Sequence, residues 1–149
     1  MDINKIFRLF NKGEDDSLLP EEELVEMKKF DMFKDTPIYK IGMFCKIISN
    51  YDFIHQYINK LFDNTEGVDL DDVEEAGRLL YYTRAFEWIK ESDLAEECWV
   101  EGWLFRNNRI IIKEVDRMIF YFSSYEEYEK CAFLLKIVTF LKDNLASEK

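Results

Sequence analysis

The feature that most constrains the fold is a change in the apolar pattern near residue 97. Up to about residue 90, apolar residues recur three and four positions apart, which is the spacing of one helix face. From residue 98 to residue 122 the chain is instead rich in β-branched and aromatic residues. The dipeptides Asn107-Asn108 and Asp116-Arg117 divide this stretch into three short segments. Strands joined by short turns have this texture, so the sequence predicts an α+β fold.

The predicted architecture is a single domain over residues 1–149. Helices occupy residues 2–90, a three-stranded antiparallel β-meander occupies residues 98–122, and a long C-terminal helix over residues 124–145 packs on the sheet. Pro20, Thr36 and Asp69 precede helical patterns and are expected to start helices, since Pro suits a first turn and Thr and Asp suit an N-cap.

Two further expectations concern the helices and the core. The helix around Asp52 is expected to turn its apolar residues inward; these are Phe53, Ile54, Tyr57, Ile58, Leu61 and Phe62. Ser123 or Ser124 is expected to cap the last helix, with Glu126 or Glu127 completing a capping box. Four apolar residues are predicted to belong to the core: Phe120, Phe122, Leu135 and Val138.

Two-residue turns would set the register of the sheet. In that register Glu101 faces Glu114, and Trp99 and Trp103 lie on the same face as these two carboxylates. Both faces are largely apolar, so either helices cover both or the tryptophan face is left for a partner. Facing carboxylates are unfavourable unless a different turn length separates them or a nearby cation screens them. The functional alternative is an acidic, tryptophan-flanked spot that accepts a partner's Arg or Lys.

The charge balance narrows the choice of partner. The chain has 31 acidic and 20 basic residues, a net charge of −11, and one histidine, His55. This balance argues against direct binding to nucleic acid or to an anionic membrane and favours a basic protein surface. No phosphate-binding loop, nucleophile elbow or zinc spacing is present, and a lone histidine is weak support for catalysis. We therefore expect no enzyme activity, no cofactor and no metal.

The cysteines and apolar runs bear on the compartment. Cys45, Cys98 and Cys131 are odd in number and lack metal-ligand spacing, so we expect reduced, buried thiols in a cytoplasmic protein. The N-terminus lacks the layout of a signal peptide. The longest apolar run, residues 131–141, contains Lys136 and is shorter than the roughly 20 residues that span a bilayer.

One stretch, Ile6-Phe-Arg-Leu-Phe-Asn-Lys-Gly-Glu-Asp-Asp-Ser-Leu-Leu-Pro-Glu-Glu-Glu-Leu24, resembles the helix, acidic loop and helix of an EF-hand. The positions of its twelve-residue loop that match the family are Asn11, Asp15, Ser17, Leu18 and Glu22. The resemblance implies calcium binding. Gly13 departs from it at a ligand position, and Asp16 departs at the glycine of the sharp turn. Residues 63–74 match less well, and the non-calcium interpretation is an acid-capped helix start.

The function expected from these features is a small acidic protein-binding module. It could serve as an inhibitor, immunity or anti-defence protein that blocks a basic, nucleic-acid-binding surface of a partner. The predicted contact residues are Asp69, Asp71, Asp72, Glu74, Glu75, Trp99, Glu101, Trp103 and Glu114. For the acidic block at 69–75, the structural alternative is a solvated helix start stabilised by the helix dipole. Two other functions remain open: an enzyme with carboxylate chemistry around Glu101 and Glu114, and a degenerate EF-hand-like calcium-binding protein.

Overall fold

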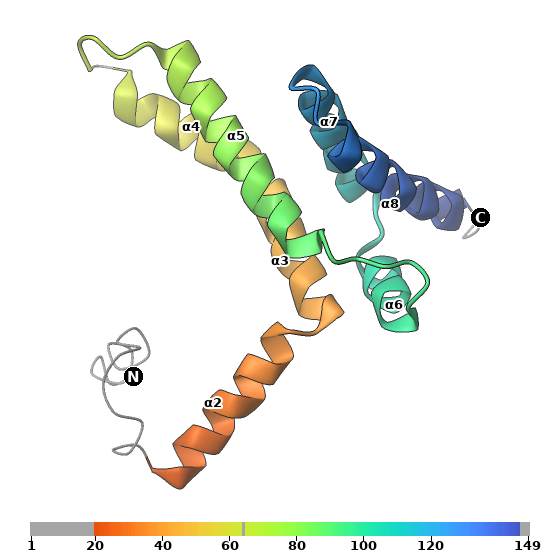
Figure 1. Cartoon of the computed structure of the whole chain (residues 1–149). Helices are drawn as coiled ribbons and strands as arrows, with labels where there is room; N and C mark the ends of the chain where they lie inside the picture. Colours follow the sequence, from red (N-terminus) through yellow and green to blue (C-terminus); the bar gives the residue numbers. More distant parts are fainter. Residues whose placement is uncertain (1–19, 64, 147–149) are drawn as a thin grey trace. The chain divides into compact units, whose positions relative to one another are not determined.

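The computed structural model describes residues 20–63 and 65–146, and every regular element within these ranges is a helix. The helices are α2 (Glu21–Lys34), α3 (Pro37–Ser49), α4 (Tyr51–Phe62), α5 (Leu70–Ile89), α6 (Glu97–Arg106), α7 (Arg109–Ser124) and α8 (Tyr128–Ala146) (Figure 1). The contacts divide the chain into two units, Met1–Asp35 and Thr36–Lys149. In the first unit, α2 follows Pro20, carries three glutamates in its first turn and has no buried residue.

The prediction of an α+β fold is wrong, because residues 98–122 form α6 and α7 and the described ranges contain no strand. Asn107-Asn108 is a break between helices rather than a hairpin turn. The Asn108 side chain accepts a hydrogen bond from the Ile111 backbone N–H at 2.9 Å and so caps α7. The buried residues of α7 recur at helical spacing: Ile111, Ile112, Glu114, Val115, Met118, Tyr121 and Phe122. Burial of this face outweighs the weak strand preference of β-branched residues.

The two tryptophans of α6 lie in the core, so the alternative that left the tryptophan face exposed for a partner is wrong. Trp99 and Trp103 are one helical turn apart, and both are buried. The Trp103 ring meets Phe44 edge-on at 5.6 Å, and its N–H donates to the Ser92 hydroxyl at 2.8 Å. Gly102 allows α6 to approach α3 closely, because a Cβ there would lie 2.8 Å from Ile41 Cδ1.

The C-terminal helix is present, but it begins at Tyr128 and packs against α7 rather than a sheet. The predicted serine cap is wrong. The Ser123 and Ser124 hydroxyls donate back to the carbonyls of Phe120 and Tyr121, within the last turn of α7. The turn to α8 follows at residues 125–127, where Glu126 has a φ of 59°.

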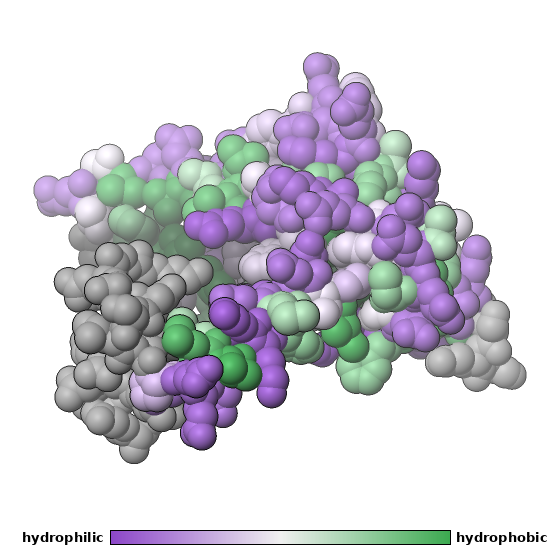
Figure 2. All heavy atoms as spheres, turned by 60° about the horizontal axis from the view of Figure 1, so that its bottom comes forward, coloured by the Kyte–Doolittle hydropathy of each residue, from purple (hydrophilic) through white to green (hydrophobic). Residues whose placement is uncertain are grey.

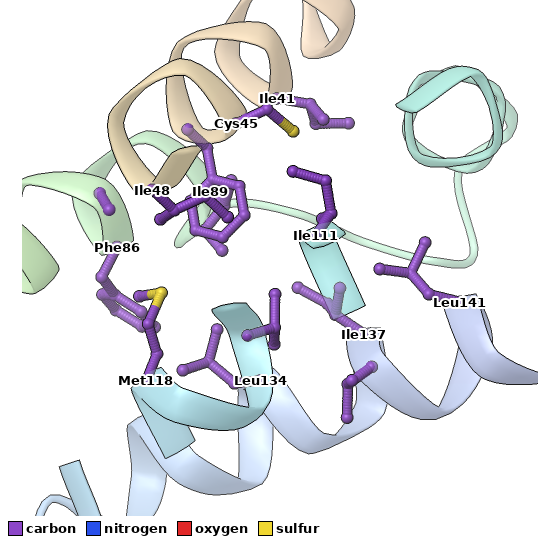
Figure 3. Close-up of a cluster of buried hydrophobic side chains, with 14 of the residues drawn as sticks. Ile41, Cys45, Ile48, Phe86, Ile89, Ile111, Met118, Leu134, Ile137 and Leu141 are labelled. Carbon is purple, nitrogen blue, oxygen red and sulfur yellow. The ribbon is translucent and has the colours of Figure 1, made fainter. Parts of the chain in front are cut away.

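The core of the second unit is built where α3, α5, α7 and α8 turn apolar side chains toward one another, joined by the tryptophans of α6. Figure 3 shows Ile41 and Ile48 of α3, Phe86 of α5, Met118 of α7 and Leu134 of α8 converging on this region. The predicted core residues that are confirmed are Phe122 and Val138, each 1% exposed.

The other two predicted core residues are wrong. Phe120 is 77% exposed and Leu135 is 56% exposed. Phe120 and Phe122 would share one face of a strand, whereas two positions along a helix turn the side chains to different faces. The error at Phe120 therefore has the same cause as the error in fold class.

Local signals at other helix starts are confirmed. The Thr36 side chain accepts from the Tyr39 N–H at 3.4 Å at the start of α3. The Asp69 side chain accepts from the Asp71 N–H at 2.9 Å at the start of α5.

The expected burial of α4 is wrong, because no residue of α4 is fully buried. Phe53, Tyr57 and Leu61 lie one turn apart and are exposed. Figure 2 shows hydrophobic residues interspersed with hydrophilic ones on the surface in view. The cysteines also differ from the expected uniform burial: Cys45 is buried, Cys131 is partly buried and Cys98 is exposed.

Two sequence predictions fall on residues that the structure does not describe. The first part of the helical region predicted over residues 2–90, up to residue 19, lies outside the described residues, as does most of the EF-hand-like loop at 11–22. Within the described ranges, no helix combines the length and the apolar composition needed to cross a membrane.

Candidate functional site

A groove of about 940 Å³ lies within the second unit, between α4, α5 and α7. Each helix contributes residues at helical spacing, so one face of each lines the groove. The lining residues are Tyr51, Asp52, His55, Asp71, Glu74, Glu75, Arg78, Tyr82, Lys113, Asp116, Arg117, Phe120, Tyr121, Ser124 and Tyr125. The groove therefore combines charged side chains with a concentration of tyrosines.

The tyrosines form a continuous row of rings across the groove. Tyr51 stacks on Tyr82 with ring centroids 5.5 Å apart and planes 13° apart. Tyr82 meets Tyr121 at 5.0 Å, and Tyr121 meets Tyr125 at 4.9 Å. Tyr51 also stacks on His55 at 5.8 Å. The faces of such rings carry partial negative charge and attract cations.

Burial keeps the central tyrosines protonated near neutral pH. It raises the pKa of Tyr82 to about 12, and Tyr51 and Glu114 nearby add to the increase. The pKa of Tyr121 is also raised, first by burial and then by its contact with the Tyr125 hydroxyl. Tyr82 and Tyr121 are therefore neutral near pH 7, and because both rings are buried, the accessible aromatic surface of the row lies on the partly exposed Tyr51 and the exposed Tyr125.

Glu74 organises the charged side chains on the α4–α5 side. Its Oε1 lies 2.6 Å from Arg78 Nη2, one helical turn along α5, and 3.0 Å from His55 Nε2 on α4. Arg78 Nε donates to the Tyr51 hydroxyl at 2.9 Å. This hydrogen bond is the main cause of a raised pKa for the Arg78 guanidinium. The positive charge of Arg78 is therefore committed to neighbours inside the groove.

Three of the four other lining carboxylates are available to a ligand. Asp52 and Asp71 form no ion pair with any residue that the structure describes. Glu75 accepts a hydrogen bond from the Tyr125 hydroxyl, which leaves its charge unneutralised. Asp116 pairs with Lys142 at 2.9 Å. Five carboxylates line the groove against three permanent cations, so its net character is acidic.

The structure places the nine residues predicted for partner contact in different surroundings. Asp71, Glu74 and Glu75 line the groove, whereas Asp69 caps α5 and Asp72 is exposed beside it without lining the groove. Glu101 is exposed on α6. The tryptophans at 99 and 103 are core residues, as described above, and are not accessible.

Glu114 is buried on α7 rather than facing Glu101 across a sheet. Its Oε1 accepts from Arg117 Nη1 at 2.8 Å, and its Oε2 is buried with no hydrogen-bond partner among the described residues. Burial raises the pKa of this carboxyl, Asp52 adds to the increase, and Arg117 opposes it. The predicted Glu101–Glu114 pair depended on the sheet register and disappears with it.

Sequence reasoning missed the tyrosine row and the Arg78–Glu74–His55 arrangement. Part of the signal was present on α5, where Glu74, Arg78 and Tyr82 follow at four-residue intervals and so share a face. The matching residues of α7, such as Arg117 and Tyr121, share a face only when residues 109–124 are recognised as a helix. Because residues 98–122 were predicted as strands, the α7 side of the groove could not be predicted.

Neither metal coordination nor relatedness supplies a function for the site. Across residues 20–63 and 65–146, no group of three or more His, Cys, Asp or Glu side chains is placed to hold a metal ion. Comparisons of the chain with protein-family models, with curated proteins and with solved structures found no match.

Proposed function

We propose that this protein is a small acidic binding module that takes a basic segment of a partner protein in the α4–α5–α7 groove. The observation that carries the proposal is the meeting of available carboxylates with the tyrosine row. Asp71 and Glu75 lie one turn apart on α5, and Glu75 accepts a hydrogen bond from the hydroxyl of Tyr125, whose ring is exposed. An Arg or Lys side chain from a partner could then pair with a carboxylate while its cation contacts a ring face.

The charge of the whole chain supports the same class of partner. A net charge of −11 accelerates encounter with a basic surface and disfavours direct contact with nucleic acid or an anionic membrane. Such a module would act by covering the basic surface, as an inhibitor, immunity or anti-defence protein does. The aromatic anchor of this proposal is the exposed ring of Tyr125 at the end of the tyrosine row, which takes the place of the buried tryptophans.

A matched pair of aspartates tests the charge contribution. Asp71 and Asp72 are adjacent in the first turn of α5, but only Asp71 lines the groove. Binding of a fluorescent arginine-rich peptide, followed by anisotropy at several salt concentrations, should weaken for Asp71→Asn by up to about fivefold, the range of an exposed ion pair. Asp72→Asn should show a smaller loss, and added salt should reduce the difference between the two.

A matched pair of tyrosines tests the aromatic contribution. Tyr125→Leu removes a lining ring together with its hydrogen bond to Glu75, whereas Tyr128→Leu changes an exposed ring that does not line the groove. Neither substitution changes the net charge, so we expect only Tyr125→Leu to weaken peptide binding. Equal losses within both pairs would show that the peptide responds to net charge alone, and the proposal would fail.

A further inference from the structure

A second cavity, of about 380 Å³, lies where α3 meets the end of α6 and the start of α7. Its lining contains no carboxylate and consists of Gly42, Cys45, Lys46, Ser49, Arg106, Asn108 and Ile111. This composition is opposite to that of the groove and to the acidic balance of the chain. The cavity shares no lining residue with the groove, so an inference about it does not rest on the proposed function.

Two cations, Lys46 and Arg106, line this cavity. Neither Lys46 nor Arg106 forms a salt bridge with a described residue, although acidic side chains outnumber basic ones in the chain. The Arg106 guanidinium lies close to the backbone of α3, because a Cβ at Gly42 would be 3.4 Å from its Nη2. The guanidinium is therefore held at contact distance from α3.

The remaining polar groups add no negative charge. Burial raises the pKa of the Cys45 thiol to about 12 despite the opposing effect of Arg106, so this thiol is neutral near pH 7. The Asn108 side chain is held as the cap of α7 by its bond from the Ile111 N–H, and its Nδ2 donates to the Arg106 carbonyl at 3.2 Å. Ser49 is exposed at the cavity and offers a hydroxyl donor.

We infer that this cavity is an oxyanion site that takes a phosphate-class dianion. Two cations match a doubly charged oxyanion better than a carboxylate, which carries one charge, and phosphate groups carry about −1.5 to −2 near pH 7. The planar fork of Arg106 can donate to two oxygens while Lys46 supplies a point charge. The cavity volume lies at the small end of the ~300–1,000 Å³ typical of ligand sites, which suits inorganic phosphate or a small phosphate ester.

Backbone amide NMR on the full chain tests this inference. Inorganic phosphate, sulfate and acetate are titrated separately, with sodium chloride used to hold the ionic strength constant. We expect saturable shifts at the amides of Lys46, Ser49 and Asn108 with phosphate and sulfate, and weaker binding of acetate. No saturable shift at these amides, or acetate binding as tightly as phosphate, would overturn the assignment.

Charge-removing variants locate the site. Arg106→Gln and Lys46→Gln should each weaken phosphate binding about tenfold, the effect of losing one charge-assisted hydrogen bond. Arg109→Gln is the matched control, because Arg109 is a cation in the first turn of α7 that does not line the cavity. All three side chains are exposed, so the variants should fold normally, which a thermal melt verifies. A loss with Arg109→Gln as large as with Arg106→Gln would show nonspecific attraction and refute the site.

Discussion

Replacing Phe120 and Phe122 separately by alanine distinguishes a helix from a strand at residues 109–124. The Phe122 side chain is buried, with its ring 5.9 Å from that of Phe86 and Lys130 Nζ 5.1 Å above it. Truncating a fully buried phenylalanine costs about 3–5 kcal/mol. Phe120 is mostly exposed, so its truncation should change the free energy of unfolding by less than about 0.5 kcal/mol.

Urea denaturation of the wild type and both variants gives the two losses, with equal m-values as the check that the unfolded state is unchanged. A loss of about 3–5 kcal/mol is a large part of the ~5–15 kcal/mol that holds a typical domain folded. The Phe122→Ala midpoint should therefore fall far below that of Phe120→Ala. Similar losses in the two variants would place both rings on one face and refute the helical packing of α7.

Two further predictions concern stability. Gly102→Ala should destabilise the protein by about 1–3 kcal/mol, because its Cβ would lie 2.8 Å from Ile41 Cδ1 and Ile41 is fully buried, with no open space to move into. Gly77→Ala, in the interior of α5, should instead stabilise the protein by about 0.5–1 kcal/mol, because the nearest atom to its Cβ would be 3.9 Å away. Thermal melts that rank the two variants the other way would contradict the packing of α6 on α3. Because the pKa of Glu114 is raised, this carboxyl keeps its proton to a higher pH in the folded protein than in the unfolded chain. Its contribution to stability is therefore greatest below its ordinary pKa of 4.5. The contribution falls as the pH rises through the pKa of the folded protein. The stability of wild type relative to Glu114→Gln, measured by urea unfolding at both ends of this window, should accordingly decrease from acid to neutral pH, and an increase would show that the ion pair with Arg117 outweighs burial.

Part of the helical fold could be predicted from local sequence signals at helix starts. Thr36 and Asp69 each have a side-chain oxygen suited to an N-cap and precede a periodic apolar pattern, and both caps form. The helix at residues 109–124 was harder to predict. Ile110-Ile111-Ile112 favours a strand by residue type, whereas Val115, Met118 and Phe122 favour a helix by their spacing. The helix prevails because it buries one apolar face and leaves Lys113 and Asp116 exposed.

The candidate site could be predicted only in part. Its charges were visible in the acidic block, since Asp71 and Glu75 line the groove. The tyrosine row depends on contacts between residues far apart in the chain, such as Tyr51 on α4 with Tyr82 on α5 and Tyr82 with Tyr121 on α7. No local pattern encodes these contacts, because tertiary packing brings the three helices together.

The most direct test of the proposed binding site is to map where an arginine-rich peptide contacts the full-length protein, using backbone amide NMR at low salt. Binding in the groove predicts saturable shifts concentrated at the lining residues of α4, α5 and α7, above all near Asp71, Glu75 and Tyr125. A neutral peptide of equal length should produce no such pattern. Shifts spread evenly over the acidic surface, or confined to helices that do not line the groove, would contradict the claim that this groove is the binding site.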